Sequence, residues 1–82
     1  MPHVLVADSN FRAMVGGVSE LNIEADNVRR LIESIDRRFP GSAAYIDRRM
    51  AIAVDGEIHQ DAGAIPLTAA SEVCLMPRIG GG

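Results

Sequence analysis

The longest regular pattern in the sequence is an apolar stripe that runs through residues 27–39. Its members recur at the three- and four-residue spacing of one helix face, and they are Val28, Leu31, Ile32, Ile35 and Phe39. This spacing predicts an amphipathic helix. Asp26 is the expected N-cap, because its carboxylate can accept from the first free amides, and Pro40-Gly41 are expected to end the helix. A helix with one apolar face must pack that face against another element.

Short strand-like segments lie on both sides of this helix. They are apolar or alternate apolar with polar residues, and they cover residues 4–7, 18–25, 50–54, 57–60 and 72–77. The first two are expected to pair antiparallel, because the loop between them is short and holds only a helical turn around residues 11–15. Asp55-Gly56 predicts a type I′ hairpin, since both central residues of that turn need positive φ. A further helical turn is expected at residues 67–70.

The resulting order is ββαβββ, which predicts an α+β domain with a sheet of four to five strands packed on one main helix. The chain has 82 residues, enough for one domain with one thin core. One helix covers only one face of the sheet, so the other face is expected to meet water or a partner. In the last strand Val73 and Leu75 point to one face, and Cys74 and Met76 to the other.

Charge and cysteine content narrow the class of protein. The chain carries 11 acidic and 8 basic residues, for a net charge of −3, whereas a nucleic-acid-binding surface needs an excess of Lys and Arg. The single cysteine, Cys74, excludes an intrachain disulfide. No stretch reaches about 18 uninterrupted apolar residues and no secretory leader opens the chain. We therefore expect a cytoplasmic protein that binds neither nucleic acid nor membrane.

No group of residues has the spacing of a catalytic or metal site. His3 and His59 are far apart, and neither has a neighbouring nucleophile or a second metal ligand. The carboxylates show no pairing typical of acid–base catalysis. We expect no catalytic residue, no metal and no bound cofactor.

The sequence ends in Pro77-Arg78-Ile79-Gly80-Gly81-Gly82. Consecutive glycines have no side chains and sample all of φ/ψ space, so residues 80–82 are expected to form a flexible tail on a domain of residues 1–79. One interpretation is a frayed terminus or an expression remnant. The other is a carboxylate that must enter the active site of another protein, because only a thin, extended segment passes a narrow channel.

The whole chain resembles the MoaD/ThiS group of ubiquitin-like sulfur carriers. The strongest likeness lies in residues 72–82, which contain an acidic residue, an apolar strand, Pro, two further residues, a small residue and a terminal Gly-Gly. Residues 12–17, the helix through residues 38–41 and residues 52–57 agree with the family in order and spacing.

This resemblance implies a ubiquitin-like β-grasp fold with a mixed sheet, and a chemistry at the last residue. A ubiquitin-activating-type enzyme would use ATP to adenylate the carboxylate of Gly82, and a sulfur donor would convert the adenylate to a thiocarboxylate. Gly81 and Gly80 would give access to that enzyme. Two positions depart from the family. Gly80 stands where Ala, Ser or Thr is usual, and Arg78 stands where many molybdopterin-type members have a second Pro or a small residue.

The implied acceptor of the sulfur is another enzyme. Length and the spacing from Pro77 to Gly82 most resemble the small subunit of molybdopterin synthase, so the large subunit of that enzyme is the first expectation, in molybdenum cofactor biosynthesis. A PLP-dependent cysteine synthase or a natural-product enzyme is the second, and thiazole synthase is the third. Ubiquitin-like domains bind partners through the open face of the sheet, so the residues expected to dock are Met76, Cys74, Arg78 and Ile79.

Two other functions are compatible with the same sequence features. A protein modifier conjugated to lysines would need an identical tail, and it would be distinguished by covalent adducts on other proteins. A plain interaction module would carry the glycines without using them, and deleting Gly81 and Gly82 would then leave its activity unchanged.

Overall fold

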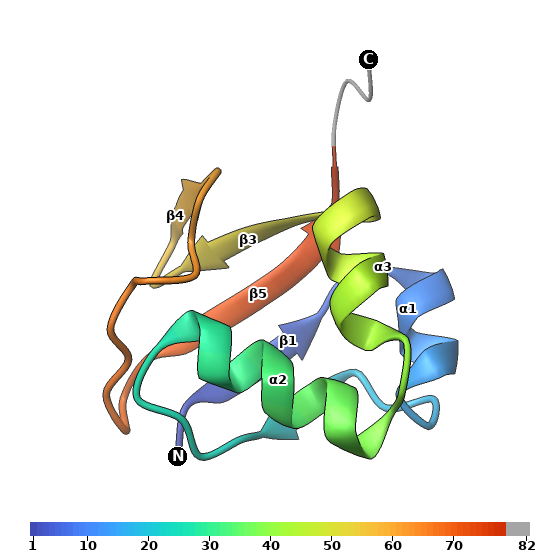
Figure 1. The fold of residues 1–82 in the computed structure, drawn as a ribbon, viewed down its shortest axis with the longest axis horizontal. Helices are drawn as coiled ribbons and strands as arrows, with labels where there is room; N and C mark the ends of the chain where they lie inside the picture. Colours follow the sequence, from blue (N-terminus) through green and yellow to red (C-terminus); the bar gives the residue numbers. More distant parts are fainter. Residues whose placement is uncertain (79–82) are drawn as a thin grey trace.

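The strands of the described residues form one five-stranded sheet. The computed structural model describes residues 1–78. The strands are β1 (His3–Val6), β2 (Glu20–Asn22), β3 (Met50–Val54), β4 (Glu57–His59) and β5 (Glu72–Pro77), in the spatial order β2-β1-β5-β3-β4. Figure 1 shows β5, the last strand in the sequence, in the middle of the sheet between β1 and β3.

The sheet is mixed because one of its four strand pairings is parallel. β1 pairs parallel with β5, with Val4 opposite Val73. The other pairings are antiparallel: β1 with β2, β3 with β5 and β3 with β4. The predicted antiparallel pairing of the first two strands is therefore confirmed. So is the hairpin, because Asp55 and Gly56 have φ values of 49° and 88°.

Three helices pack on one face of this sheet. They are α1 (Ser9–Met14), α2 (Val28–Arg38) and α3 (Ser42–Arg49), and all three contribute side chains to the same core as β5. Leu31 of α2, Phe11 of α1 and Ile46 of α3 are buried there together with Leu75. None of the helices within residues 1–78 is long and apolar enough to span a bilayer.

The fold agrees with the predicted α+β domain, with α2 as the main helix and α1 as the expected turn near residues 11–15. Helix α3 is a correction, because the prediction left residues 42–49 unassigned. Only Ser42 and Ile46 of this helix are buried, which gives one short contact and no recurring stripe. Its N-cap is Gly41, with φ 101° and no side-chain hydrogen bond, so the usual start signal is missing as well.

Three local predictions are also corrected. The N-cap of α2 is Asn27 rather than Asp26, since Asn27 has an extended backbone and its side chain accepts a backbone N–H of the first turn at 2.8 Å. Residues 67–70 form no helix; a turn there is closed by a bond from Ser71 N–H to the Thr68 carbonyl at 3.1 Å. The second strand is shorter than predicted, because β2 covers only three residues.

Candidate functional site

Pro77 and Arg78 are the last two residues that the structure describes, and the glycine segment follows them in the sequence after Ile79. The predicted tail residues Gly80, Gly81 and Gly82, and the predicted docking residue Ile79, lie outside the described residues. In Figure 1 the end of β5 lies beside the C-terminal end of α3. The central strand of the sheet therefore leads, through Arg78, to the glycine segment in the sequence. We call residues 77–78 the tail root.

Pro77 fits in a central strand because β1 is shorter than β5. β1 pairs with β5 as far as Leu75, whereas β3 pairs with β5 as far as Pro77. Arg78 N–H donates to the Arg49 carbonyl at 3.1 Å, on the β3 side. Backbone groups alternate in direction along a strand, so the nitrogen of Pro77 faces the β1 side. The missing N–H falls beyond the paired length of β1, where a strand tolerates proline.

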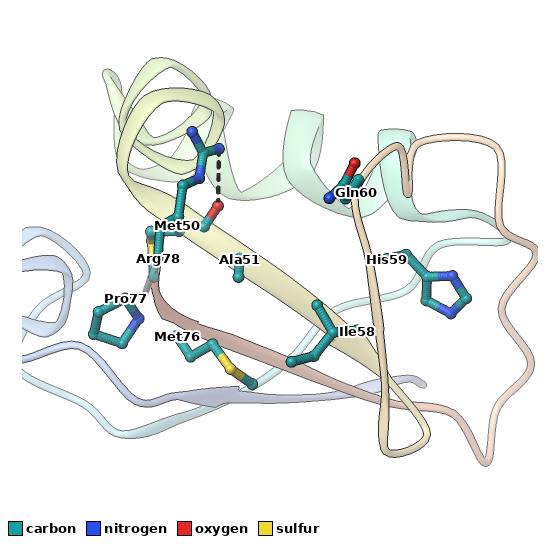
Figure 2. Close-up of a pocket in the computed structure, with 8 residues that line it drawn as sticks. All are labelled: Met50, Ala51, Ile58, His59, Gln60, Met76, Pro77 and Arg78. Carbon is teal, nitrogen blue, oxygen red and sulfur yellow. Dashed lines mark hydrogen bonds between the residues drawn. The ribbon is translucent and has the colours of Figure 1, made fainter. Parts of the chain in front are cut away.

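The Arg78 side chain turns back onto the chain itself. Its Nη2 donates to the Asp47 carbonyl at 2.9 Å and to the Met50 carbonyl at 3.3 Å; Figure 2 shows the second bond as a dashed line. Arg78 is exposed, so its predicted role in docking remains a prediction. The contacts show a second role that the sequence did not reveal, which is to connect the tail root to α3 and β3.

An exposed cavity of about 560 Å³ adjoins the tail root (Figure 2). Its lining combines apolar side chains with a few polar ones, from Met50, Ala51, Ile58, His59, Gln60, Met76, Pro77 and Arg78. Of the predicted docking residues, the structure thus places Met76 and Arg78 together in one lining. Cys74 lies outside it, although it is on the same strand.

The strand register assembles an apolar row on the face of the sheet away from the helices. Leu5 lies opposite Cys74, Cys74 opposite Ala53, and Ala53 opposite Ile58. Met76 and Ala51 form the next pair on this face. We call these residues the open-face patch: Leu5, Ala51, Ala53, Ile58, Cys74 and Met76. Sequence analysis identified Cys74 and Met76 but missed Ile58, whose side chain is 64% exposed. An apolar residue between Glu57 and His59 on an edge strand was the available signal.

The pKa of the Cys74 thiol is raised, which disfavours the thiolate needed for nucleophilic chemistry. Partial burial raises its pKa, and the negative charge of Glu72 raises that pKa further. A reactive cysteine needs the opposite shift, because the thiolate is the nucleophile. The environment of Cys74 therefore fits an apolar surface better than a redox or relay role.

The remaining ionisable candidates form surface pairs. His3 Nε2 lies 2.6 Å from Glu20 Oε1, and His59 Nε2 lies 3.9 Å from Glu57 Oε2, with all four side chains at least partly exposed. Among residues 1–78 no three His, Cys, Asp or Glu side chains come together as a metal site. Each of the two histidines therefore has one carboxylate neighbour.

The mixed five-stranded sheet, the main helix packed on one face and the central last strand define a β-grasp protein. The chain belongs to the ThiS family, because the model of that family matches residues 10–82. The sequence-based assignment to the MoaD/ThiS group is thus confirmed at this level, and the chain is a ThiS-family sulfur carrier.

Solved structures agree on the fold. CysO from Mycobacterium tuberculosis, described as an antigen, has a TM-score of 0.85 at 16% identity, over 96% of this chain and 100% of that one. The Amycolatopsis orientalis BexX/CysO complex has a TM-score of 0.85 at 17% identity, with full coverage of both chains. Small archaeal modifier protein 1 from Methanosarcina acetivorans has a TM-score of 0.74 at 20% identity, over 100% of this chain and 98% of that one. No curated protein gave a sequence match.

Proposed function

We propose that this chain carries sulfur as a thiocarboxylate on Gly82. The observation that supports this most is that the family match extends through residue 82, and so includes the three glycines that follow the tail root. A carboxylate is a poor electrophile. Attack of the Gly82 carboxylate on the α-phosphate of ATP releases pyrophosphate and gives an acyl-adenylate. A sulfur donor then displaces AMP, which leaves the C-terminal thiocarboxylate.

The carrier requires two partners in turn, an adenylating enzyme of the ubiquitin-activating type and a sulfur acceptor. Residues 79–82 can reach at most about 14 Å when fully extended. A partner whose active site receives Gly82 must therefore lie close to the tail root. The cavity beside the root and the open-face patch are the adjacent apolar surfaces, and we propose that partners dock there through Met76 and Cys74, with Ile79 next to the root.

The acceptor we favour is a cysteine-synthase-type or natural-product enzyme rather than the large subunit of molybdopterin synthase. Two of the structural neighbours are CysO chains, and one of these is in complex with BexX. Neither family match nor fold gives specific support to the molybdopterin expectation. Thiazole synthase, the third acceptor considered from the sequence, remains open.

Intact mass tests the carrier function. The purified chain is incubated with ATP, sulfide and an adenylating enzyme known to modify another ThiS-family carrier. We expect one oxygen to be replaced by one sulfur, located at Gly82, and no change in a variant that lacks Gly81 and Gly82. An unmodified chain beside a modified control carrier would refute the proposal. The thiocarboxylate is then offered to a cysteine synthase and to the large subunit of molybdopterin synthase, and sulfur transfer identifies the acceptor class.

A second candidate function is that of a protein modifier, and the similarity to small archaeal modifier protein 1 favours it. The same activated tail would then form an isopeptide bond to a lysine. Tagged chain expressed in its own host would give covalent adducts on other proteins, and those adducts would disappear when Gly81 and Gly82 are deleted.

A further inference from the structure

Arg78, the last residue that the structure describes, donates hydrogen bonds to three backbone carbonyls. Its backbone N–H donates to Arg49 at 3.1 Å, and its guanidinium donates to Asp47 at 2.9 Å and to Met50 at 3.3 Å. All three acceptors belong to the last turn of α3 or to the first residue of β3. Arg78 is thereby connected to α3 and β3, which lie about 30 positions earlier in the sequence.

The fold leaves these carbonyls short of other donors. The last carbonyls of a helix have no partner within the helix, and they form the negative end of its dipole. The Met50 carbonyl lacks a strand partner on its outer side for a different reason, because β4 pairs only with Ile52 to Val54 and ends at His59, whereas the Met50 N–H donates to the Ile46 carbonyl. The bond from Arg78 N–H to Arg49 implies that the polar groups of Met50 face this outer side. The guanidinium fills the place that a longer β4 would occupy.

We propose that Arg78 is a positioning residue, which fixes the position and direction of the chain at residue 78, where residues 79–82 begin, and so prepares Gly82 for entry into an active site. This inference rests on the proposed carrier function. With a reach of at most about 14 Å, a tail on a displaced root cannot compensate by stretching. A root that is already fixed also loses less backbone freedom when the tail enters a channel.

The alternative is that Arg78 acts by its charge on an acidic partner. Arg48 distinguishes the two roles, because it is exposed, lies at the same end of α3, and its side chain makes no hydrogen bond or ion pair within residues 1–78. Arg48→Met removes the same charge without touching the three carbonyls. Arg78→Met removes both the charge and the guanidinium bonds while keeping a similar length of side chain.

The test begins with the wild-type chain and the adenylating enzyme that modifies it. If that chain forms no thiocarboxylate, the carrier function itself fails, whatever Arg78 does. If it does, kcat/KM for adenylation is measured for both variants, well below their melting temperatures. Arg78→Met is expected to lower kcat/KM roughly tenfold, as for a displaced reacting group, at both low and high salt. Arg48→Met is expected to stay within about twofold.

A structural readout accompanies the rates. Hydrogen exchange at the Arg78 amide is expected to accelerate in Arg78→Met, because the guanidinium bonds that hold the root are lost, and to stay unchanged in Arg48→Met. Arg78→Lys, which can still donate to carbonyls, is expected to recover part of the rate and serves as the test variant if Arg78→Met does not fold. Wild-type kcat/KM in Arg78→Met, or equal losses in both Met variants that disappear at high salt, would overturn the positioning role.

Discussion

At the scale of single residues, the β3–β4 hairpin depends on the positive φ of Gly56, which is 88°. A Cβ at this position would meet no atom within 4 Å, so Gly56→Ala tests backbone strain alone. We expect a loss of about 1 kcal/mol in the free energy of unfolding, measured by urea denaturation. Gly63→Ala is the control, because Gly63 has no positive φ and its Cβ would meet only the guanidinium end of the Arg29 side chain, with the nearest atom at 3.3 Å. Equal stability of the two variants would contradict the assignment of strain to Gly56.

The start of α2 gives a second test at this scale. Asn27→Ala removes the side-chain oxygen that accepts the Arg30 N–H at 2.8 Å, and we expect it to cost about 1 kcal/mol of stability in urea. Asp26→Ala removes only an exposed ion pair to Arg30 at 3.8 Å, which is worth roughly 0.5 kcal/mol or less. The opposite ranking would restore Asp26 as the N-cap.

The thiol of Cys74 gives a third test. Burial and Glu72 raise its pKa, so at a pH just below the ordinary thiol range the folded protein holds less thiolate than a free cysteine. We expect iodoacetamide, followed by mass spectrometry, to modify Cys74 more slowly than it modifies the urea-unfolded chain. Glu72→Gln should increase the folded rate, because it removes the second cause of the shift. A folded rate equal to the unfolded one would show that the thiol is not shielded.

At the scale of elements, the sequence predicted those that bury a repeating pattern. The stripe from Val28 to Ile35 and the alternation from Val73 to Met76 each recur often enough to identify α2 and β5. Helix α3 was not predicted, because Ile46 is its only large buried side chain and because Gly41 provides no side-chain cap. The N-cap of α2 was misplaced since Asp26 and Asn27 are both good capping residues, and only the backbone conformation distinguishes them.

The alternation in β5 predicts a strong difference between neighbouring positions. Leu75 is fully buried in the core, whereas Cys74 is half-buried on the open face. We expect Leu75→Ala to cost about 2–5 kcal/mol, since it leaves a cavity under the central strand, and Cys74→Ala to cost less than about 1 kcal/mol. Thermal or urea unfolding of the two variants measures this, and similar losses would mean that both faces are covered in solution.

At the scale of the whole molecule, the site is a surface assembled from distant segments. The tail could be predicted from the sequence because its glycines are consecutive. The open-face patch could not be fully predicted, because Leu5, Ala53 and Ile58 are brought together only by the pairing of β1, β5, β3 and β4. The contacts of Arg78 could not be predicted either. Their acceptors are backbone carbonyls of α3 and β3, and a pattern of side chains in the sequence does not indicate which carbonyls are free to accept.

The open-face patch predicts which exposed apolar residue matters for partners. Ile58 and Val18 are 64% and 41% exposed, but only Ile58 lines the cavity beside the tail root. Ile58→Glu is expected to raise KM for the adenylating or acceptor enzyme about tenfold or more, as loss of an interface anchor does, with little change in melting temperature. Val18→Glu is the matched control and should behave as wild type. Equal KM values for both variants would place docking elsewhere.

The position of β5 has a consequence for how the chain is made. The strand that leads to the glycines is also the strand that joins the two halves of the sheet, since β1 and β3 contact each other only through it. During synthesis, β1 and β3 cannot complete their pairing until β5 has emerged from the ribosome. Truncated products that stop before residue 72 would therefore lack a closed sheet and be open to proteolysis. Only chains whose C-terminal region has been translated would then be folded when they encounter an activating enzyme.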